Sequence, residues 1–174
     1  NQNADEKEQI AKFAASLIQE DDFVYLDAGT TTGMMIEFIH NTRATFMTNA
    51  VTHARKLSAK GLQVLVPCGL LKSRTDALVG ADTCQYLENF NFTKGFFGAN
   101  GVTIREGFTT PDRQEATVKK TALSRCKEKY ILCDGSKFDQ ISAVKICDFV
   151  KATCVTDESV PSIYKLQDTV LITE

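Results

Sequence analysis

The sequence predicts an α/β fold in which a mostly parallel sheet is flanked by helices. Two observations predict it: short apolar runs recur along the chain, and segments with helical periodicity separate them. Such alternation places the strands in parallel and covers both faces of the sheet with helices. The 174 residues, 43% of them hydrophobic, are enough for one core. We therefore expect one domain over residues 1–174.

In the first half of the chain, a helix is expected to come first, because apolar residues recur at helical spacing. They are Ile10, Phe13, Ala14, Leu17 and Ile18. Aromatic and β-branched runs then predict strands, and the segments between them predict helices. The elements are a strand at 23–26, a helix at 34–39, a strand at 44–48, a helix to about residue 60 and a strand at 62–67. Asn49 is expected to cap the second of these helices and Gly61 to end it.

In the second half, glycine and polar residues predict the loops, and apolar runs again predict strands. Asp112 and Glu115 have the spacing of a capping box, which marks a helix start. The elements in order are a loop at 68–80, a helix at about 81–88, a strand at 94–97, a long polar loop from Gly98, a helix from Asp112 to about Lys127, strands at 129–134 and 152–157, a short helix at 160–165 and a strand at 169–173.

Charge and composition argue against several classes of function. The formal net charge is −2, from 20 basic and 22 acidic residues, and no dense basic run appears. Proteins that bind nucleic acid by neutralising phosphates usually carry a basic patch, so this absence is a weak argument against DNA contact by this segment. The alternative is a basic patch that folding assembles from scattered residues. No apolar run approaches the roughly 20 residues of a membrane span, and the polar start NQNADEKEQ does not resemble a signal peptide. The first residue is not Met, so we expect a piece of a longer protein.

The six cysteines are expected to be reduced. None forms a C-x-x-C pair and no His lies at zinc-finger spacing, so neither a metal site nor a disulfide framework is predicted. Most lie in apolar segments, as small buried residues in a reducing cytoplasm do. Cys68 precedes Gly69 in a predicted loop and is the best candidate for an exposed thiol.

Ligands of such sheets bind beyond the carboxyl ends of the strands, and the loops expected there are polar. The first is YLDAGTTTG at 25–33. Free N–H groups at a helix start attract an anion, and the hydroxyls of Thr30, Thr31 and Thr32 add donors that suit phosphate. The alternative is that the threonines only cap a helix. Neither the Walker pattern nor G-x-G-x-x-G is present.

Three further loops at this edge carry candidate ligands. Lys137, in DGSK, can place a point charge on phosphate, although a single loop lysine is usually a solvated surface residue. Asn100 and Gly101 lie in GANG, where the backbone can approach a ligand closely, although a plain turn is the commoner meaning. Glu115 either completes the capping box or accepts sugar hydroxyls. Arg74 is a second possible cation, with a solvated side chain as its default.

The two histidines carry little signal. His40 is expected at a helix end, where a cation favours the helix dipole. His53 is expected to face solvent, and no Ser-His-Asp arrangement is persuasive.

Six motifs occur in one order: LDAGTTT, TNA, a glycine loop ending in ALVG, FFGANGV, GFTTPD followed by QEA, and DGSKF. This series resembles the effector-binding domain of DeoR-family transcriptional repressors, from the first helix to the last strand. Within the family, YLDAGTTTGMMI, HARKLSAKG and KGFFGANGVT look most like the fructose operon repressors of Gram-positive bacteria. The lactose phosphotransferase repressors come second, because their first loop tends to differ from LDAGTTT.

The resemblance implies a fold like that of ribose-5-phosphate isomerase and the CoA transferases, with a phosphorylated sugar as effector. The residues that it assigns to the phosphate are Gly29, Thr30, Thr31, Thr32 and Lys137. The residues that it assigns to the sugar are Asn49, Gly69, Arg74, Asn100, Gly101 and Glu115. Arg74 is the least secure of these, because Cys68 replaces the first of the two glycines usual in its loop.

The resemblance also implies an N-terminal winged helix-turn-helix outside these residues. Operator DNA is therefore expected as a partner of the full-length protein only. We expect a cytoplasmic homo-oligomer, a dimer or a tetramer, without a cofactor, a metal or a membrane partner. Fructose 1-phosphate is the first choice of effector and tagatose 6-phosphate the second.

Two other classes of function remain open. A sugar-phosphate isomerase or deaminase on the same fold would move a proton next to a carbonyl, which needs a positioned carboxylate base. The isomerases carry acidic residues in the loop where Asn100 stands, and Glu115 has no obvious acid partner. We therefore expect binding without turnover. The third class is an oligomerisation module, in which no sugar phosphate would raise the melting temperature.

Overall fold

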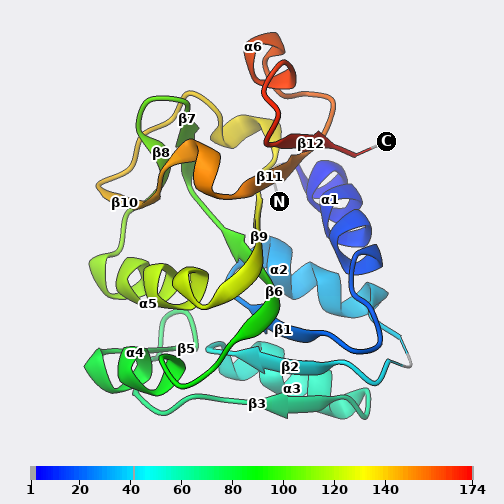
Figure 1. The fold of residues 1–174 in the computed structure, drawn as a ribbon, viewed down its shortest axis with the longest axis vertical. Helices are drawn as coiled ribbons and strands as arrows, with labels where there is room; N and C mark the ends of the chain where they lie inside the picture. Colours follow the sequence, from blue (N-terminus) through cyan, green and yellow to red (C-terminus); the bar gives the residue numbers. More distant parts are fainter. Residues whose placement is uncertain (1–2, 41, 174) are drawn as a thin grey trace.

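The computed structural model describes residues 3–40 and 42–173. Its centre is a seven-stranded sheet with the order β12-β11-β9-β6-β1-β2-β3, drawn from top to bottom in Figure 1. Every neighbouring pair in this sheet is parallel, which confirms the predicted fold class. The strands are β1 (Phe23–Leu26), β2 (Thr45–Thr48), β3 (Gln63–Leu65), β6 (Phe92–Gly98), β9 (Cys126–Leu132), β11 (Thr153–Thr156) and β12 (Val170–Ile172).

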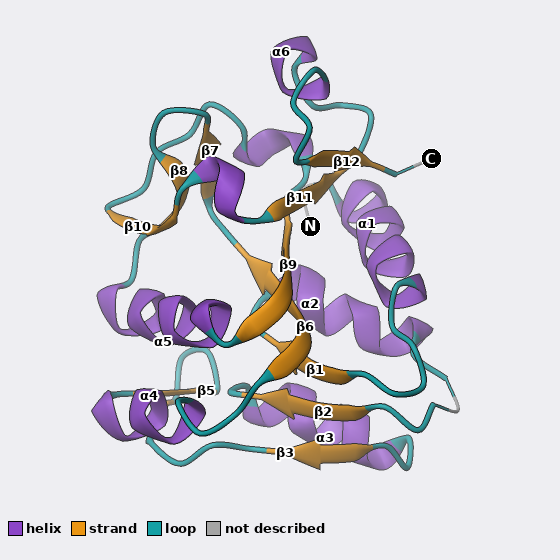
Figure 2. Cartoon of the chain, in the orientation of Figure 1, coloured by secondary structure: helices purple, strands orange, loops and turns teal. Residues whose placement is uncertain are grey.

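Helices cover both faces of this sheet (Figure 2). One face carries α1 (Ala4–Ser16), α2 (Thr30–Met35), η1 (Ile36–Phe38) and α3 (Val51–Ala59); the other carries α4 (Ala81–Leu87) and α5 (Arg113–Ser124). The alternation within β1 serves both layers, because Val24 and Leu26 pack on the first face and Tyr25 on the second. No described helix is long and apolar enough to cross a membrane.

Five short strands lie outside the central sheet, in segments where no strand was predicted. They are β4 (Leu70–Lys72), β5 (Ala77–Val79), β7 (Gly101–Thr103), β8 (Gly107–Thr110) and β10 (Val144–Cys147). β4 and β5 form an antiparallel hairpin, and the others form an antiparallel sheet with the order β10-β8-β7. These runs lie in segments whose glycine and polar residues predict loops. The helix predicted to reach Lys127 ends at Ser124, because β9 begins at Cys126.

The predicted cap of α3 is wrong. Ala50 occupies the N-cap position, and the Asn49 side chain donates to the Leu78 carbonyl at 3.1 Å. The Leu78 N–H in turn donates to the Asn49 carbonyl at 2.7 Å. Docking of the β4–β5 hairpin on the end of β2 therefore outweighs the capping preference of Asn49.

The six cysteines are free in the structure. Cys68 is exposed, as predicted, whereas Cys126, Cys133 and Cys154 are buried. Burial raises the pKa of the Cys126 thiol to about 12. This thiol therefore stays protonated and acts as a small apolar core group.

A buried ion pair joins the central strands β1 and β6 to α5. The Asp27 carboxylate, just after β1, contacts the Lys119 ammonium on α5 and accepts the Gly98 N–H at 3.0 Å. Lys119 also donates to the Gly98 carbonyl at 3.1 Å. Asp27 and Lys119 are 2% and 7% exposed, so water has little access to either partner.

His53 packs α3 against α2, so the expectation that it faces solvent is wrong. Its Nε2–H donates to the Gly29 carbonyl at 2.9 Å. The ring lies so close to Gly33 that a Cβ there would be 2.6 Å from His53 Cε1. Nδ1 is buried and has no hydrogen-bond partner among the described residues. Burial lowers the pKa of His53 below its ordinary value of 6.5, although the Gly29 hydrogen bond opposes this shift.

Replacing Lys119 by Met should destabilise the protein by about 3 kcal/mol, because Asp27 would stay buried without its counter-charge. Urea unfolding at neutral pH measures this loss. The matched control is Lys120→Met, which removes an exposed ammonium from the next position of α5 and should barely change the free energy of unfolding. Equal losses in both variants would contradict the role assigned to the ion pair.

The free energy of unfolding should fall as the pH drops below 6.5. The pKa of His53 is lower in the folded state, so below that pH the unfolded state binds more protons. The stabilisation is complete above pH 6.5, and His53 adds a slope of up to about 1.4 kcal/mol per pH unit below it. Urea unfolding of His53→Gln across this range should lack that contribution. An unchanged slope would rule out His53 as its source.

Candidate functional site

A cleft opens where the order of the strands changes direction. From β1 the chain runs outward through β2 to β3, and it then returns to β6 on the other side of β1. In open α/β sheets, ligands bind at such a switch point, beyond the carboxyl ends of the strands. The cleft has a volume of about 210 Å³, with walls from α1, the β1–α2 turn, the end of β6, α5 and the segment after β9.

Six of the predicted ligand residues line this cleft. They are Gly29, Thr30, Thr31, Asn100, Glu115 and Lys137. Thr30 and Thr31 belong to the first turn of α2, and Lys137 ends η2 (Gly135–Lys137), the turn that follows β9. The tertiary structure thus brings together residues from segments far apart in the sequence. A larger hollow of about 290 Å³ elsewhere contains none of them.

The three consecutive threonines have two different environments. α2 begins at Thr30 rather than near residue 34, and Gly29 occupies its N-cap. Thr30 and Thr31 line the cleft, whereas Thr32 is fully buried. The Thr32 hydroxyl lies 2.6 Å from the Asp27 carbonyl and accepts the Gly29 N–H at 3.0 Å. Thr32 therefore stabilises the turn at the start of the helix and does not line the cleft. The two roles considered for the threonines thus belong to different residues, since Thr30 and Thr31 line the cleft.

Four predicted sugar ligands do not line the cleft: Asn49, Gly69, Arg74 and Gly101. Asn49 is bound to the hairpin, as described above. Gly69 has a φ of 146°, and a Cβ there would lie 1.9 Å from the Thr83 hydroxyl, so this position needs glycine for the fold. Gly101 opens β7. Arg74 is exposed at the turn between β4 and β5.

Two of the three lysines that line the cleft were missed from the sequence. Lys7 comes from α1 and Lys119 from α5, whereas Lys137 was predicted. Lys119 follows Glu115 by one helical turn, so helical spacing could have placed both on one face; no comparable signal marked Lys7. Lys119 is held by its buried ion pair. No ion pair joins Lys7 or Lys137 to a carboxylate within residues 3–40 and 42–173.

The two carboxylates that line the cleft are both engaged by neighbouring donors. Asp134 accepts hydrogen bonds from the Ser136 N–H, at 2.9 Å, and from the Ser136 hydroxyl. Glu115 Oε2 lies 3.8 Å from the Lys72 ammonium. Asp134 is thus held through Oδ1 by Ser136, and Glu115 forms a longer ion pair with Lys72.

Asn100 forms the wall at the end of β6. The Thr110 hydroxyl donates to Asn100 Oδ1 at 3.0 Å, and the Asn100 N–H donates to the Thr109 carbonyl at 2.9 Å. These bonds fix both the backbone and the amide plane. Hydroxyl, amide and ammonium groups around one cleft suit a ligand that combines an oxyanion with hydroxyls. Across the part of the chain that the structure describes, no group of three or more His, Cys, Asp or Glu is placed to hold a metal ion.

Solved structures share this fold at low sequence identity. Ribose 5-phosphate isomerase A from Methanocaldococcus jannaschii gives a TM-score of 0.59 at 17% identity, over 78% of this chain and 55% of that one. eIF2B beta from Chaetomium thermophilum gives a TM-score of 0.53 at 19% identity, over 80% of this chain and 40% of that one. These likenesses confirm the predicted isomerase-like fold and carry no functional assignment.

Sequence comparisons identify the family. The model of the DeoR C terminal sensor domain matches residues 2–158. The chain is 39% identical over 160 residues to the uncharacterized HTH-type transcriptional regulator FruR of Bacillus subtilis, covering 91% of the chain and 64% of the relative. It is 38% identical over 136 residues to the lactose phosphotransferase system repressor of Streptococcus mutans, covering 76% and 54%. The chain thus spans less than two thirds of either relative. It belongs to the DeoR C-terminal sensor domain family of transcriptional regulators, which confirms the resemblance.

Proposed function

We propose that this chain senses a phosphorylated sugar for a repressor of sugar catabolism. The observation that carries the proposal is the cleft at the switch point, in which Thr30, Thr31 and Lys137 lie together. Fructose 1-phosphate is our first choice of effector, because the sequence resembles the fructose operon repressors. Tagatose 6-phosphate is the second, since other relatives are named lactose phosphotransferase system repressors.

The phosphate would bind between α2 and η2. The first-turn N–H groups of α2 have no intrahelical acceptor, and the Thr30 and Thr31 hydroxyls add donors beside them. Lys137 and Lys7 supply ammonium groups from two further elements. Charge-assisted hydrogen bonds to a phosphate dianion are about twice as strong as neutral ones, so this wall favours phosphate over an uncharged group.

The sugar would extend toward Asn100 and Glu115, which form the other wall. The carboxylate of Glu115 can accept sugar hydroxyls, and the Asn100 amide can donate or accept. Gly29 closes the turn between the two ends of the ligand, with its carbonyl held by His53. The ligand would thus bridge the β1–α2 turn, the end of β6 and α5.

In the full-length protein, the effector would act by shifting a population of states. It would bind one arrangement of the subunits of a homo-oligomer better than another, with a coupling free energy of roughly 1–3 kcal/mol. The DNA-binding parts, which lie outside this chain, would then lose or gain the spacing that the operator requires. This chain alone would sense the sugar and would not read DNA.

Lys137→Ala should weaken fructose 1-phosphate binding by roughly 10- to 100-fold, because a charge-assisted hydrogen bond contributes about 1.5–3 kcal/mol. Calorimetric titration with a series of hexose phosphates measures the affinities. The matched control is Lys151→Ala, since Lys151 ends η3 (Phe149–Lys151) as Lys137 ends η2 but lies away from the cleft. An unchanged affinity in Lys137→Ala would remove Lys137 from the site.

The competing function is a sugar-phosphate isomerase or deaminase, which the fold of the isomerases favours. Mixing the protein with sugar phosphates and following isomer ratios by NMR should show no turnover, because Asn100 stands where the isomerases carry acidic residues and an amide does not take up a proton at neutral pH. Turnover at enzyme-like rates would refute the proposal that the chain is a sensor.

A saturating sugar phosphate should raise the free energy of unfolding, by about 2.7 kcal/mol at 100 times its dissociation constant. A melting temperature that no sugar phosphate raises would favour an oligomerisation module instead.

A further inference from the structure

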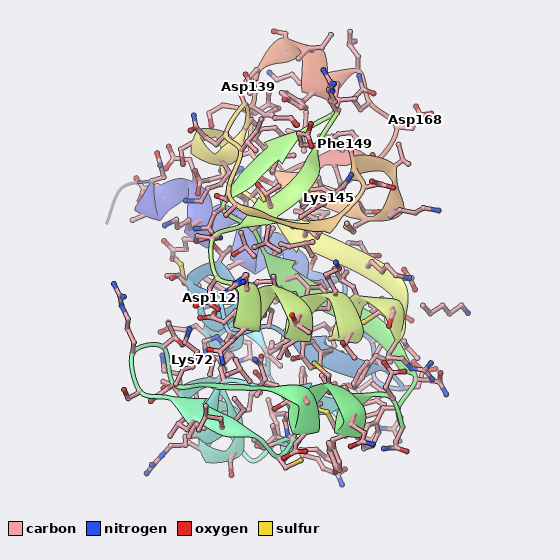
Figure 3. All side chains as sticks on the ribbon, turned by 90° about the vertical axis from the view of Figure 1, so that its left-hand side faces the viewer. Lys72, Asp112, Asp139, Lys145, Phe149 and Asp168 are labelled. Carbon is pink, nitrogen blue, oxygen red and sulfur yellow. The ribbon has the colours of Figure 1, made fainter. Side chains whose placement is uncertain are left out.

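The β4–β5 hairpin reaches the sugar side of the cleft through one lysine. The Lys72 ammonium donates to the Asp112 carboxylate and lies 3.8 Å from Glu115 Oε2. Figure 3 shows Lys72 beneath Asp112, at the N-terminal end of α5. The side chains of Lys72 and Glu115 are 21% and 19% exposed, so water screens their interaction only in part.

Lys72 lies between two carboxylates of the same helix end. Asp112 is the N-cap of α5 and accepts the Glu115 N–H at 2.9 Å, which places both carboxylates within one turn. The negative charges of Asp112 and Glu115, within one helical turn of each other, repel. The hydrogen bond between Lys72 and Asp112 raises the pKa of Lys72 and lowers the pKa of Asp112, so both are ionised at neutral pH. Among the described residues, Lys72 is the cation within ion-pair distance of Glu115.

The hairpin is anchored independently of this contact. The Thr52 hydroxyl on α3 donates to Asp76 at 2.7 Å, and the Thr83 hydroxyl on α4 donates to the Cys68 carbonyl at 2.6 Å. Asn49 holds the hairpin from β2, as described above. Lys72 therefore lies on a hairpin whose position is fixed by other contacts. The position of the Lys72 ammonium therefore determines where the Glu115 carboxylate can form an ion pair.

We propose that Lys72 is a positioning residue for the sugar end of the site, an inference that rests on the proposed function. It holds the Glu115 carboxylate at the cleft wall, where that group accepts sugar hydroxyls. The phosphate end depends on α2 and η2, which Lys72 does not touch. Loss of Lys72 therefore affects recognition of the sugar and leaves recognition of phosphate intact.

Calorimetric titration of Lys72→Met with fructose 1-phosphate and with inorganic phosphate tests this separation. The affinity for the sugar phosphate should fall roughly tenfold, the factor that corresponds to about 1.4 kcal/mol. The affinity for inorganic phosphate should stay within about twofold, since its contacts are unchanged. Lys72→Arg should restore most of the sugar-phosphate affinity. The matched control is Lys120→Met, which removes an exposed ammonium from α5 outside the cleft lining and should leave both affinities unchanged.

A second background separates positioning from a general structural effect. In Glu115→Gln, adding Lys72→Met should cause no further loss of sugar-phosphate affinity, because Lys72 acts through Glu115. An equal loss for both ligands in Lys72→Met, no loss for either, or full additivity with Glu115→Gln would overturn the inference. If the parent protein binds neither ligand, the proposed function itself fails. Urea unfolding of each variant confirms that the fold compared is the same.

Discussion

A buried ion pair between Asp27 and Lys119 sets the geometry on which the cleft depends. β1 and β6 are neighbours in the sheet, but the chain leaves them in different directions. The Asp27 carboxylate accepts the Gly98 N–H, and Lys119 donates to the Gly98 carbonyl. The two strand ends and α5 are therefore tied to one point. A buried charge is tolerated here because Asp27 and Lys119 each have an oppositely charged partner and hydrogen bonds. A buried polar network in which every group is hydrogen-bonded favours a single packing of the elements that it joins.

The β1–α2 turn is built upon this point. The Thr32 hydroxyl bonds to the Asp27 carbonyl and to the Gly29 N–H, and His53 holds the Gly29 carbonyl from the other side. Thr30 and Thr31 are left facing the cleft on a backbone that is bonded on both flanks. A turn fixed in this way loses little conformational entropy when a ligand binds to it. This arrangement also explains why a run of three hydroxyl residues is used where one cap would suffice for the helix.

The distribution of charge around the cleft fits capture of an anion better than proton transfer. Lys7 and Lys137 face it without an ion-pair partner in the described part of the chain, while Asp134 and Glu115 are engaged by Ser136 and Lys72. Under the proposed function, a ligand that spans the cleft would touch α1, α2, α5 and the ends of two central strands. Binding energy can therefore favour one relative placement of these elements, which is the physical requirement for a sensor.

The local pattern of the sequence was enough for the fold class, because periodicity and turn residues act over a few neighbouring positions. It located the strands of the central sheet, the loops at their carboxyl ends and six of the residues that line the cleft. The motif order also placed the chain in its family. The short strands β4 and β10 escaped, because the glycine and polar residues around them predict loops. β10 in addition pairs with β8, a segment far from it in the sequence.

Tertiary structure alone decided the environment of each side chain. It buried Thr32, whereas Thr30 and Thr31 line the cleft. It committed Asn49 to the hairpin and brought Lys7 and Lys119 to the cleft from two helices. It also turned Lys72 rather than Arg74 toward Glu115. These outcomes depend on the register and packing of segments far apart in the chain, where a contact reflects the whole arrangement and not the preference of any one residue.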